Sequence, residues 1–403
     1  MVKAAILGIG TVGGGTAEVL AKNRELIARR AGQEIELKYI LCRSPRPGHP
    51  LESLIVHDIE PIASDPEVGV VAECMGGLSP AFEYVSRCLL AGKNVVTSNK
   101  ELVAERGLEL TALARKMGVN FMFEASVGGG IPILRPISQC LAANEISAVY
   151  GILNGTTNYI LTEMIQRGKS FEQALREAQE KGFAEADPTA DVEGIDAGRK
   201  ICILADLCFG KNVPPSAITT EGITHITPAD IACARTLGYK IKLLGRAMRT
   251  GPNSVTAFVA PHLISQSNPI ANVDGVLNGI AVRGDAVGEA MFFGPGAGAL
   301  PTASAVAADM IDCVRDPGTR VYAGWWPSEK GYVTGPDKLS CRWMVRTAAP
   351  LAEIAAAFSG VRFINAPNAA ADEYAFVTAY MSGEELAEKT AGMDVLAKYR
   401  VLD

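Results

Sequence analysis

Short apolar runs alternate with longer amphipathic segments through the first third of the chain. The runs predict buried strands at residues 2–7, 34–42, 68–77, 94–100 and 119–130. The segments 80–93 and 101–118 between them are predicted to be helices. Strands that alternate with helices are typical of a doubly wound parallel sheet. We therefore predict an α/β domain over residues 1–130.

After this first domain the pattern becomes mixed. Residues 237–250 and 254–264 look like strands of a second sheet, and residues 278–298 continue it. A long apolar helix at about 300–316 is expected to return to the first domain and complete it. We therefore predict a mixed α+β domain over residues 131–299.

A last segment, residues 338–403, follows a stretch rich in glycine and proline. It reads in turn as strand, helix, strand, strand, helix and strand, over residues 341–348, 350–360, 361–367, 373–382, 383–393 and 395–402. That order is typical of the split ferredoxin-like unit. We therefore expect a third, ferredoxin-like domain.

Composition and charge narrow the class of protein. At 403 residues the chain is too long for one ordinary core. Its formal net charge is −6 without a block of like charges, so we expect no nucleic-acid partner. The nine cysteines are scattered and are expected to be reduced thiols. No apolar run approaches the ~20 residues of a membrane span, and the opening lacks a signal-peptide cleavage pattern, so we expect a soluble, cytoplasmic protein.

The first predicted strand runs into a turn with the pattern G-x-G-x-x-G, formed by Gly8, Gly10 and Gly13. In this pattern the first glycine permits a tight turn, the second lets backbone amides approach a pyrophosphate, and the third lets the helix pack on the strand. The N-terminus of the following helix favours phosphates. The motif therefore predicts a Rossmann nucleotide-binding domain, with Thr11 and Val12 also among the cofactor contacts.

Other cofactor contacts are expected where the strands end, because ligands of such sheets bind outside the carboxyl ends of the strands. The second strand ends in Arg43 and Ser44. It lacks the Asp or Glu that would hold the ribose 2′-hydroxyl of NAD, so we expect NADP, or tolerance of NAD as well. The later strand ends supply the further predicted contacts Met75, Gly76, Thr97, Ser98, Asn99 and Lys100.

Acidic residues gather just before an apolar helix that begins with a lysine. The group consists of Glu185, Asp187, Asp191, Glu193, Asp196 and Lys200. Asp196 and Lys200 are four residues apart, which puts them on one face of a helix. The residues alone allow two interpretations: a solvated acidic loop that caps a core helix, or a polar pocket.

Five motifs, in order, resemble those of homoserine dehydrogenases. They are the glycine-rich opening, "TSNK" at 97–100, "FEASVGGGIPIL" at 123–134, "LNGTTNYIL" at 153–161 and the acidic segment at 182–200. The resemblance covers about residues 1–320. Such enzymes interconvert aspartate 4-semialdehyde and homoserine with a nicotinamide cofactor, on the route to threonine and methionine.

The resemblance implies that the acidic segment lines a substrate pocket. Homoserine is a zwitterion, so its ammonium favours carboxylates and its carboxylate favours hydrogen-bond donors. The implied substrate contacts are Gly155, Thr156, Glu185, Asp191, Asp196 and Lys200, with Glu185 or Asp191 nearest the ammonium. The family often has tyrosine where this chain has Phe183, so a hydroxyl contact is missing if that tyrosine binds substrate.

The resemblance also implies two catalytic lysines. Hydride transfer to an aldehyde builds negative charge on its oxygen, which a donor must neutralise. Lysine suits this role where burial or a neighbouring cation lowers its pKa. Lys100 and Lys200 are both expected to be catalytic, one exchanging the proton and the other holding the oxygen, with Asp196 positioning Lys200 or the substrate. The sequence leaves open which lysine does which.

Three further features follow from the resemblance. A sodium or potassium ion is implied on Glu124 and the carbonyls of Val127, Gly129 and Ile131, although a plain interdomain hinge would also explain this loop. Gly296 is expected to close over the nicotinamide ribose. A homodimer is expected, because the second sheet pairs subunits in this family, so residues 131–299 would serve both substrate binding and dimerisation.

The tail resembles the ACT domains that close many homoserine dehydrogenases. The ligand turn of those domains carries an acid followed by Pro-Gly, whereas this chain has "TAAPL" at 347–351. Threonine inhibition and a purely structural or dimerising role therefore both stay open.

Two other functions fit parts of the pattern. An aspartate-semialdehyde dehydrogenase would share the nucleotide fold but needs a thiolate nucleophile, and no cysteine lies beside a plausible base at a strand-to-helix turn in mid-chain. A nucleotide- or amino-acid-sensing protein would not need the paired lysines. We therefore predict a homoserine dehydrogenase.

Overall fold

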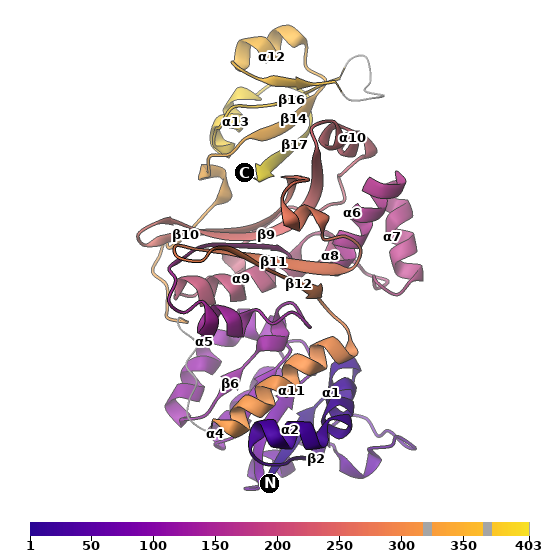
Figure 1. Ribbon diagram of the computed structural model, residues 1–403, viewed down its shortest axis with the longest axis vertical. Coiled ribbons are helices and arrows are strands. Elements are labelled where there is room, and N and C mark those ends of the chain that lie inside the picture. The colour runs from indigo at the N-terminus through magenta and orange to yellow at the C-terminus, as the bar shows by residue number, and fades with distance from the viewer. Residues whose placement is uncertain (317–324, 366–372, 403) are drawn as a thin grey trace.

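The computed structural model describes residues 1–316, 325–365 and 373–402. Two sheets dominate it and follow each other along the long axis of the molecule (Figure 1). The N-terminal elements lie at one end of this axis, and the helices α12 and α13 lie at the other. One buried apolar cluster extends through both sheets. Among the described residues, no helix is both long enough and apolar enough to cross a membrane.

The first sheet is parallel and has six strands in the order β3-β2-β1-β4-β5-β6. Their bounds are Val2–Leu7 (β1), Ile35–Leu41 (β2), Ile55–Val56 (β3), Val68–Glu73 (β4), Asn94–Thr97 (β5) and Phe121–Met122 (β6). From β1 the chain winds in both directions, so the strand order reverses between β1 and β4 and leaves a crevice for ligands at the strand ends. The predicted doubly wound α/β fold is confirmed.

Six helices surround this sheet in the described structure. They are Thr11–Lys22 (α1), Arg24–Ala31 (α2), Glu60–Ser64 (α3), Ala81–Leu90 (α4), Lys100–Met117 (α5) and Ala299–Arg315 (α11). Helix α11 comes from far along the chain, yet it packs against α1, α2 and β4 (Figure 1). The predicted return of a late helix to the first sheet is therefore observed.

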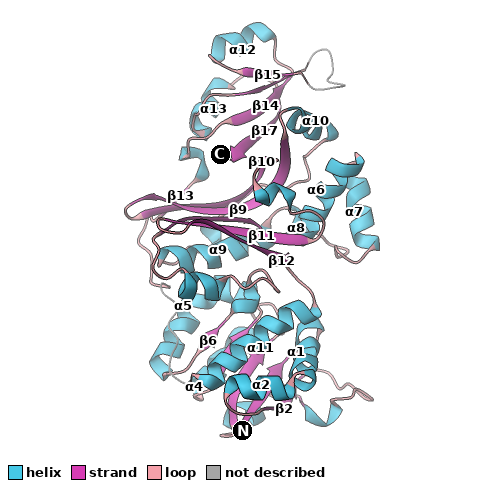
Figure 2. Ribbon diagram, viewed as in Figure 1, coloured by secondary structure: helices cyan, strands magenta, loops and turns pink. Residues whose placement is uncertain are grey.

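The second sheet is mixed, and β9 and β10 form a long antiparallel hairpin within it (Figure 2). The strands before the tail are Ile146–Ile152 (β7), Thr219–Thr220 (β8), Tyr239–Gly251 (β9), Ser254–Ser265 (β10), Leu277–Gly284 (β11), Gly288–Pro295 (β12) and Val333–Thr334 (β13). The helices of this region are Gly155–Arg167 (α6), Phe171–Glu180 (α7), Thr189–Val192 (α8), Ile195–Phe209 (α9) and Pro228–Thr236 (α10). Helix α9 packs against β7, β9 and β10 on one side and α5 on the other, so it lies between the two sheets.

The tail has the predicted order of strands and helices. Its elements are Trp343–Thr347 (β14), Leu351–Ala357 (α12), Arg362–Ile364 (β15), Tyr374–Val377 (β16), Gly383–Lys389 (α13) and Val395–Leu402 (β17). Residues 366–367 of the strand predicted at 361–367 lie outside the described residues. Strand β17 pairs with β14 on one side and, in parallel, with β10 on the other. The tail therefore extends the second sheet.

The strand predicted at 119–130 is wrong over most of its length. Strand β6 ends at Met122, and a short 3₁₀ turn follows over Glu124–Ser126. The backbone N–H of Glu124 donates to the Asp309 carboxylate of α11 (2.9 Å), and Gly128 and Gly129 have positive φ angles. These contacts with a distant helix draw the segment away from the ladder and make it an irregular loop.

Candidate active site

The glycine-rich turn after β1 has the geometry of a phosphate cradle. Gly8 has φ +97°, and a Cβ on Gly13 would lie 1.9 Å from the Gly8 carbonyl oxygen, so both positions require glycine. A Cβ on Gly10, by contrast, would meet nothing within 4 Å. Gly10 is also the N-cap of α1 and provides no side-chain cap, which leaves the first amides, from Thr11 and Val12 onward, free for a ligand. The residues present therefore fit a dinucleotide.

The predicted contact for the ribose lies next to this turn. The Gly8 N–H donates to the carbonyl of Leu41, the last residue of β2 (2.9 Å). Arg43 and Ser44 follow this strand after Cys42 and are both exposed. The described structure therefore places the end of β2, from which these two residues continue, beside the glycine turn.

A hydrogen-bond network joins the ends of β4 and β5. Asn99 is the N-cap of α5: its Oδ1 accepts from the Leu102 N–H (3.1 Å), and its Nδ2 donates to the Gly77 carbonyl (2.7 Å). Thr97 Oγ1 accepts from the Asn99 N–H (2.9 Å). The predicted cofactor residues Met75, Gly76, Thr97, Ser98 and Asn99 therefore lie together. Their shared partner, the buried Glu73, was missed from sequence, although an acid that ends an apolar strand is a usable signal.

Lys100 and Lys200 meet on a single carboxylate. Lys200 donates to Asp196 Oδ2 (2.6 Å) and to the Leu153 carbonyl (2.7 Å), and Lys100 forms an ion pair with Asp196 Oδ1. Lys100 is the first residue of α5, whereas Asp196 and Lys200 lie on α9. The pairing therefore joins the elements that carry the two predicted catalytic lysines.

Burial and charge determine the ionisation of this group. The side chains of Asp196 and Lys200 are 5% and 10% exposed, whereas that of Lys100 is 40% exposed. Burial favours a higher pKa for Asp196, but the charges of Lys200 and Lys100 outweigh it and hold the pKa below its usual range. Burial lowers the pKa of Lys200, and the nearby charge of Lys100 lowers it further against the opposing effect of Asp196. Burial and the neighbouring cation therefore both favour the neutral form of Lys200.

Asn154 orients the acidic side of the site. Its Nδ2 donates to Asp191 Oδ1 (2.7 Å) and to Asp196 Oδ2 (2.9 Å), while its Oδ1 caps α6 through the Thr157 N–H (2.9 Å). One amide thus fixes two carboxylates and a helix N-terminus. Sequence reasoning missed Asn154, although it directly precedes the predicted Gly155.

The N-terminus of α6 lies beside the acidic segment. A Cβ on Gly155 would lie 2.7 Å from the Val276 carbonyl oxygen, so the close approach of that loop requires glycine. Thr156 Oγ1 donates to the Phe183 carbonyl (2.7 Å) and ties the acidic segment to this helix. The polar-pocket interpretation of the acidic segment is therefore the better one for Asp191 and Asp196.

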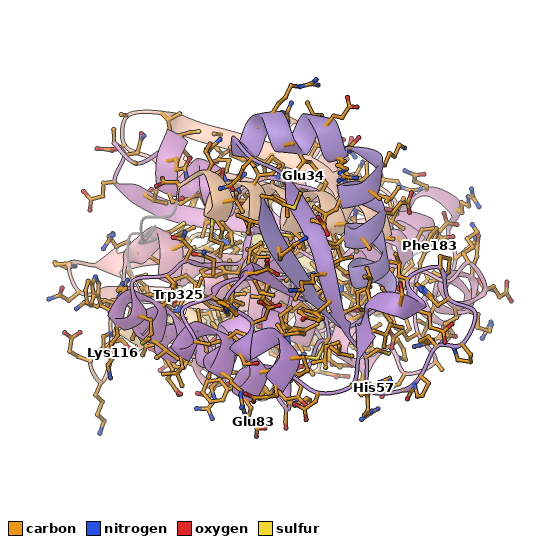
Figure 3. All side chains as sticks on the ribbon, turned by 90° about the horizontal axis from the view of Figure 1, so that it is seen from below. Glu34, His57, Glu83, Lys116, Phe183 and Trp325 are labelled. Carbon is orange, nitrogen blue, oxygen red and sulfur yellow. The ribbon has the colours of Figure 1, made fainter. Side chains whose placement is uncertain are left out.

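Glu185 and Phe183 are not drawn into this cluster. Glu185 is exposed, and no other described side chain forms a hydrogen bond or ion pair with its carboxylate. Phe183 is 41% exposed and packs edge-on against Tyr159, with ring centroids 5.1 Å apart. Figure 3 accordingly places Phe183 at the periphery of the molecule.

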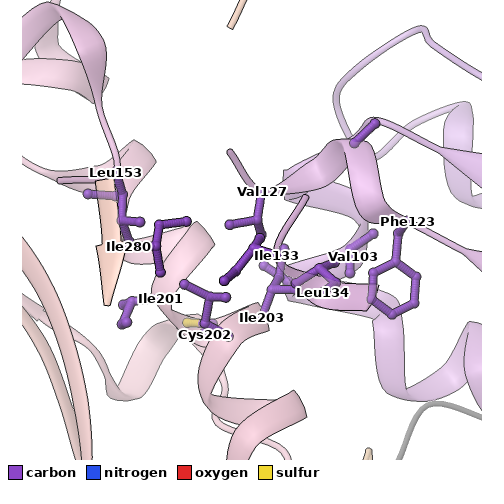
Figure 4. Packing of buried hydrophobic residues seen from close by; sticks show 14 of the residues in the cluster. Val103, Phe123, Val127, Ile133, Leu134, Leu153, Ile201, Cys202, Ile203 and Ile280 are labelled. Carbon is purple, nitrogen blue, oxygen red and sulfur yellow. The ribbon is translucent and has the colours of Figure 1, made fainter. Parts of the chain in front are cut away.

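Apolar packing fixes the helix that carries Lys200. In Figure 4, Ile203 of α9 lies beside Ile133 of the loop that follows β6, and Val127 of that loop and Ile201 of α9 are labelled in the same view. All four side chains are at most 2% exposed, and all belong to the cluster that extends through both sheets. The position of Lys200 is therefore determined by buried contacts on either side of the domain junction.

The predicted cation residues lie on the same loop. Glu124 Oε1 accepts from the N–H groups of Ile133 (2.6 Å) and Leu134 (2.9 Å), and its Oε2 accepts from that of Arg135 (2.7 Å). The carboxylate thus anchors the following turn. A Cβ on Gly129 would lie 2.6 Å from the Gly296 carbonyl oxygen, so the predicted nicotinamide loop packs directly on the predicted cation loop.

Cys74, which directly precedes the predicted cofactor residue Met75, does not fit the nucleophile of an aspartate-semialdehyde dehydrogenase. Burial together with the charge of Glu73 raises its pKa to about 12. A nucleophilic cysteine requires the opposite shift. This observation disfavours the thiolate alternative.

Comparison with known proteins agrees with this geometry. Family models described as "Homoserine dehydrogenase, NAD binding domain" and "Homoserine dehydrogenase" match residues 8–124 and 132–311. The homoserine dehydrogenase of Pseudomonas aeruginosa is 49% identical over 325 residues, which are 79% of this chain and 75% of that protein. That of Bacillus subtilis is 40% identical over 78% of this chain and 73% of its own length.

Solved structures of homoserine dehydrogenases are similar to this chain as well. A homoserine dehydrogenase from Thiobacillus denitrificans aligns with a TM-score of 0.90 and 38% identity, covering 100% of this chain and 98% of its own. A hyperthermophilic archaeal homoserine dehydrogenase, solved in complex with NADPH, aligns with a TM-score of 0.67 and 27% identity over 79% of this chain and 99% of its own. The chain belongs to the homoserine dehydrogenase family, the NAD(P)-dependent oxidoreductases that interconvert L-aspartate 4-semialdehyde and L-homoserine in threonine and methionine biosynthesis.

Proposed function

We propose that Lys100, Asp196 and Lys200 are the catalytic centre of this homoserine dehydrogenase. The observation that carries the proposal is the shared carboxylate: each oxygen of Asp196 pairs with one lysine. Two ammonium groups held this close repel each other unless an anion lies between them. Asp196 therefore acts as the positioning residue that keeps both lysines in one site.

The two lysines have different roles in this proposal. Lys200 exchanges the proton with the substrate oxygen, because burial and the charge of Lys100 lower its pKa. Lys100 is the more exposed of the two and stabilises the negative charge that develops on that oxygen. When bound, the nicotinamide supplies the hydride to the aldehyde carbon or accepts it from the alcohol carbon. In the oxidative direction, the hydroxyl proton passes to the neutral amine of Lys200.

The substrate site is proposed to use the N-terminus of α6. The N–H groups of Gly155 and Thr156 have no described partner within the helix or outside it, and helix N-termini favour anions. We assign these two residues to the homoserine carboxylate. Asp191 lies beside Asp196 through their shared partner Asn154 and is assigned to the ammonium, with Glu185 at the exposed side.

The cofactor site is proposed to hold NADP in preference to NAD. The amides from Gly10 to Gly13 would hold the pyrophosphate, and Arg43 and Ser44 would hold the 2′-phosphate. Met75, Gly76 and Gly296 would flank the nicotinamide end. Support comes from the open space at Gly10 and from the exposed Arg43, which follows the strand that ends beside the glycine turn.

A monovalent cation, Na⁺ or K⁺, is proposed on the loop that follows β6. The carbonyls of Val127, Gly129 and Ile131 accept no hydrogen bond from the described residues, and such oxygens suit an alkali cation. The carboxylate of Glu124 is occupied by three amides, so it contributes negative charge nearby. The ion would join this loop to the residues that carry Gly296.

We also propose the division of the chain and its assembly. Residues 1–130 with α11 form the nucleotide domain, residues 131–299 form the substrate and dimerisation domain, and residues 338–403 form an ACT-like module. Support for the module is its strand order β17-β14-β16-β15, and support for a homodimer is Phe293, which is 68% exposed on the outermost strand β12. Light scattering coupled to gel filtration measures the assembly.

The catalytic proposal is tested by Lys200→Ala. We expect homoserine oxidation to fall by at least about 100-fold, the usual scale of a lost general acid–base group. Cofactor binding, followed by fluorescence, is expected to stay unchanged, because Lys200 lies on α9 outside the nucleotide residues. A variant that turns over at the wild-type rate would remove Lys200 from the mechanism.

A further inference from the structure

Glu73 is a buried acid at the ligand edge of the parallel sheet. It is the last residue of β4 and is 0% exposed. Its Oε1 accepts from the N–H groups of Met75 (2.7 Å) and Gly76 (3.3 Å), and its Oε2 accepts from Thr97 Oγ1 (2.5 Å). No described lysine or arginine forms an ion pair with it. The carboxylate therefore relies on neutral donors, and the side chain of Asn99 is a further one.

Its two oxygens serve two different loops. One oxygen holds the Met75–Gly76 turn, which the cofactor is expected to contact. The other holds Thr97, whose Oγ1 in turn accepts from the N–H of Asn99, the N-cap of α5. Lys100 follows this cap as the first helical residue. A continuous chain of hydrogen bonds thus leads from Glu73 to the backbone that carries Lys100.

The sheet itself does not require an acid at this position. Its neighbours in β4 are buried apolar residues, including Val70, Val71 and Ala72, each 0% exposed. Burying a carboxylate without a cation costs several kcal/mol, whereas an apolar side chain would stabilise the same position. Burial raises the pKa of Glu73, and the surrounding donors oppose that effect. A costly polar group at a ligand edge is characteristic of functional sites.

We propose that Glu73 is a positioning residue for the dehydrogenase reaction. Through Thr97 and Asn99 it fixes the start of α5, and hence the point from which Lys100 reaches Asp196 and the substrate. Through Met75 and Gly76 it fixes the turn that faces the cofactor. This inference rests on the proposed role of Lys100.

Thr97→Val tests the hydrogen-bonded connection from Glu73 through Thr97 to the backbone that carries Lys100. Valine keeps the shape of threonine but removes the hydroxyl, while Met75 and Gly76 keep their acceptor. We expect kcat to fall roughly 10–100-fold, the scale of a small misplacement of a catalytic group. The KM for the cofactor should change by less than about twofold, because the hydrogen bonds from Met75 and Gly76 to Glu73 are intact.

Two matched variants separate positioning from general stability. Thr97→Ser keeps the hydroxyl and should restore kcat to near the wild-type value. Thr111→Val makes the same substitution at another buried threonine of the nucleotide domain, on α5, whose Oγ1 has no described hydrogen-bond partner. It should leave both kcat and KM unchanged. Thermal melting of all three variants measures the loss of stability independently.

Glu73→Leu removes the hydrogen bonds to the Met75–Gly76 turn and to Thr97. It should therefore lower kcat and raise the cofactor KM together. If this variant does not fold, the threonine variants decide. A Thr97→Val enzyme with wild-type kcat would overturn the proposal. A raised cofactor KM with unchanged kcat would also overturn it, because it would make Thr97 a direct cofactor contact.

Lys100→Met, assayed in parallel, distinguishes a failure of the positioning role of Glu73 from a failure of the proposed catalytic role of Lys100. If Lys100→Met loses turnover while Thr97→Val keeps it, the positioning role of Glu73 alone fails. If Lys100→Met keeps wild-type turnover, the proposed catalytic role of Lys100 fails, and the inference fails with it.

Discussion

In the proposed mechanism the charge of Lys100 acts on the substrate oxygen and also on its neighbour Lys200. Removing this charge by Lys100→Met should raise the pKa of Lys200, because a nearby cation no longer disfavours its protonated form. Homoserine oxidation needs Lys200 neutral, so the rate rises with pH through this pKa. We therefore expect the midpoint of the pH–rate profile to move to higher pH in the variant, with a lower maximal rate.

Lys100→Arg is the control for this prediction, since it keeps the charge at the same position. Its midpoint should stay close to the wild-type value. A Lys100→Met profile with an unshifted or lower midpoint would show that Lys200 is not the group that titrates. Initial rates measured across the pH range, with saturating homoserine, provide the data.

The proposed preference for NADP depends on one exposed guanidinium, that of Arg43. Arg43→Ala should raise the KM for NADP by roughly tenfold, the equivalent of one lost charge-assisted contact of about 1.4 kcal/mol. The KM for NAD should be almost unchanged, because NAD lacks the 2′-phosphate. Initial rates with both cofactors, run side by side, measure the ratio. Equal losses with the two cofactors would instead place Arg43 against a part that they share.

At the scale of elements, the start of α6 contributes to stability and, in the proposed site, to substrate binding. Asn154→Ala removes the N-cap of α6 and both hydrogen bonds to Asp191 and Asp196. The lost cap should cost about 1 kcal/mol of stability. The lost orientation of two carboxylates should raise the KM for homoserine by roughly tenfold, since hydrogen bonds to charged groups contribute about 1.5–3 kcal/mol.

Ser170→Ala provides the matched control for this helix cap. Ser170 caps α7 through its own capping box, away from the catalytic residues, so its loss should cost similar stability. The KM for homoserine should not change in this variant. Chemical denaturation and steady-state kinetics on the same preparations separate the two effects. Equal KM values in the two variants would contradict the role of Asn154.

At the scale of the whole molecule, a buried ion pair joins the tail to the second sheet region. Arg346 of β14 donates to Asp230 of α10 (3.0 Å), which is 0% exposed, and to Glu373 (2.7 Å). Arg346→Met would leave a buried carboxylate without its cation, which typically costs about 3 kcal/mol or more. We expect a markedly lower urea midpoint. Arg283→Met, which breaks the exposed pair with Glu289, should cost less than about 1 kcal/mol.

Local patterns made much of this protein predictable. The glycine turn is determined by the sequence because its requirements are local: the positive φ of Gly8 and the contact between Gly8 and Gly13 arise within six residues of chain. The pairing of Asp196 with Lys200 follows from helical spacing alone. The alternation of strands and helices predicted the parallel sheet because that alternation, too, is a local pattern along the chain.

Contacts between distant segments could not be predicted in this way. Lys100 meets Asp196 only because α5 and α9 pack together, and Glu73 meets Thr97 only because β4 and β5 pair in register. The loop after β6 left the expected strand because Glu124 binds Asp309 of α11. Glu185 lies outside the charged cluster, although it belongs to the same acidic segment as Asp191. The sequence by itself determined the elements and the residue types of the site, since these depend on neighbours along the chain. The tertiary structure decided which of those residues meet, since that depends on how buried surfaces far apart in sequence pack against one another.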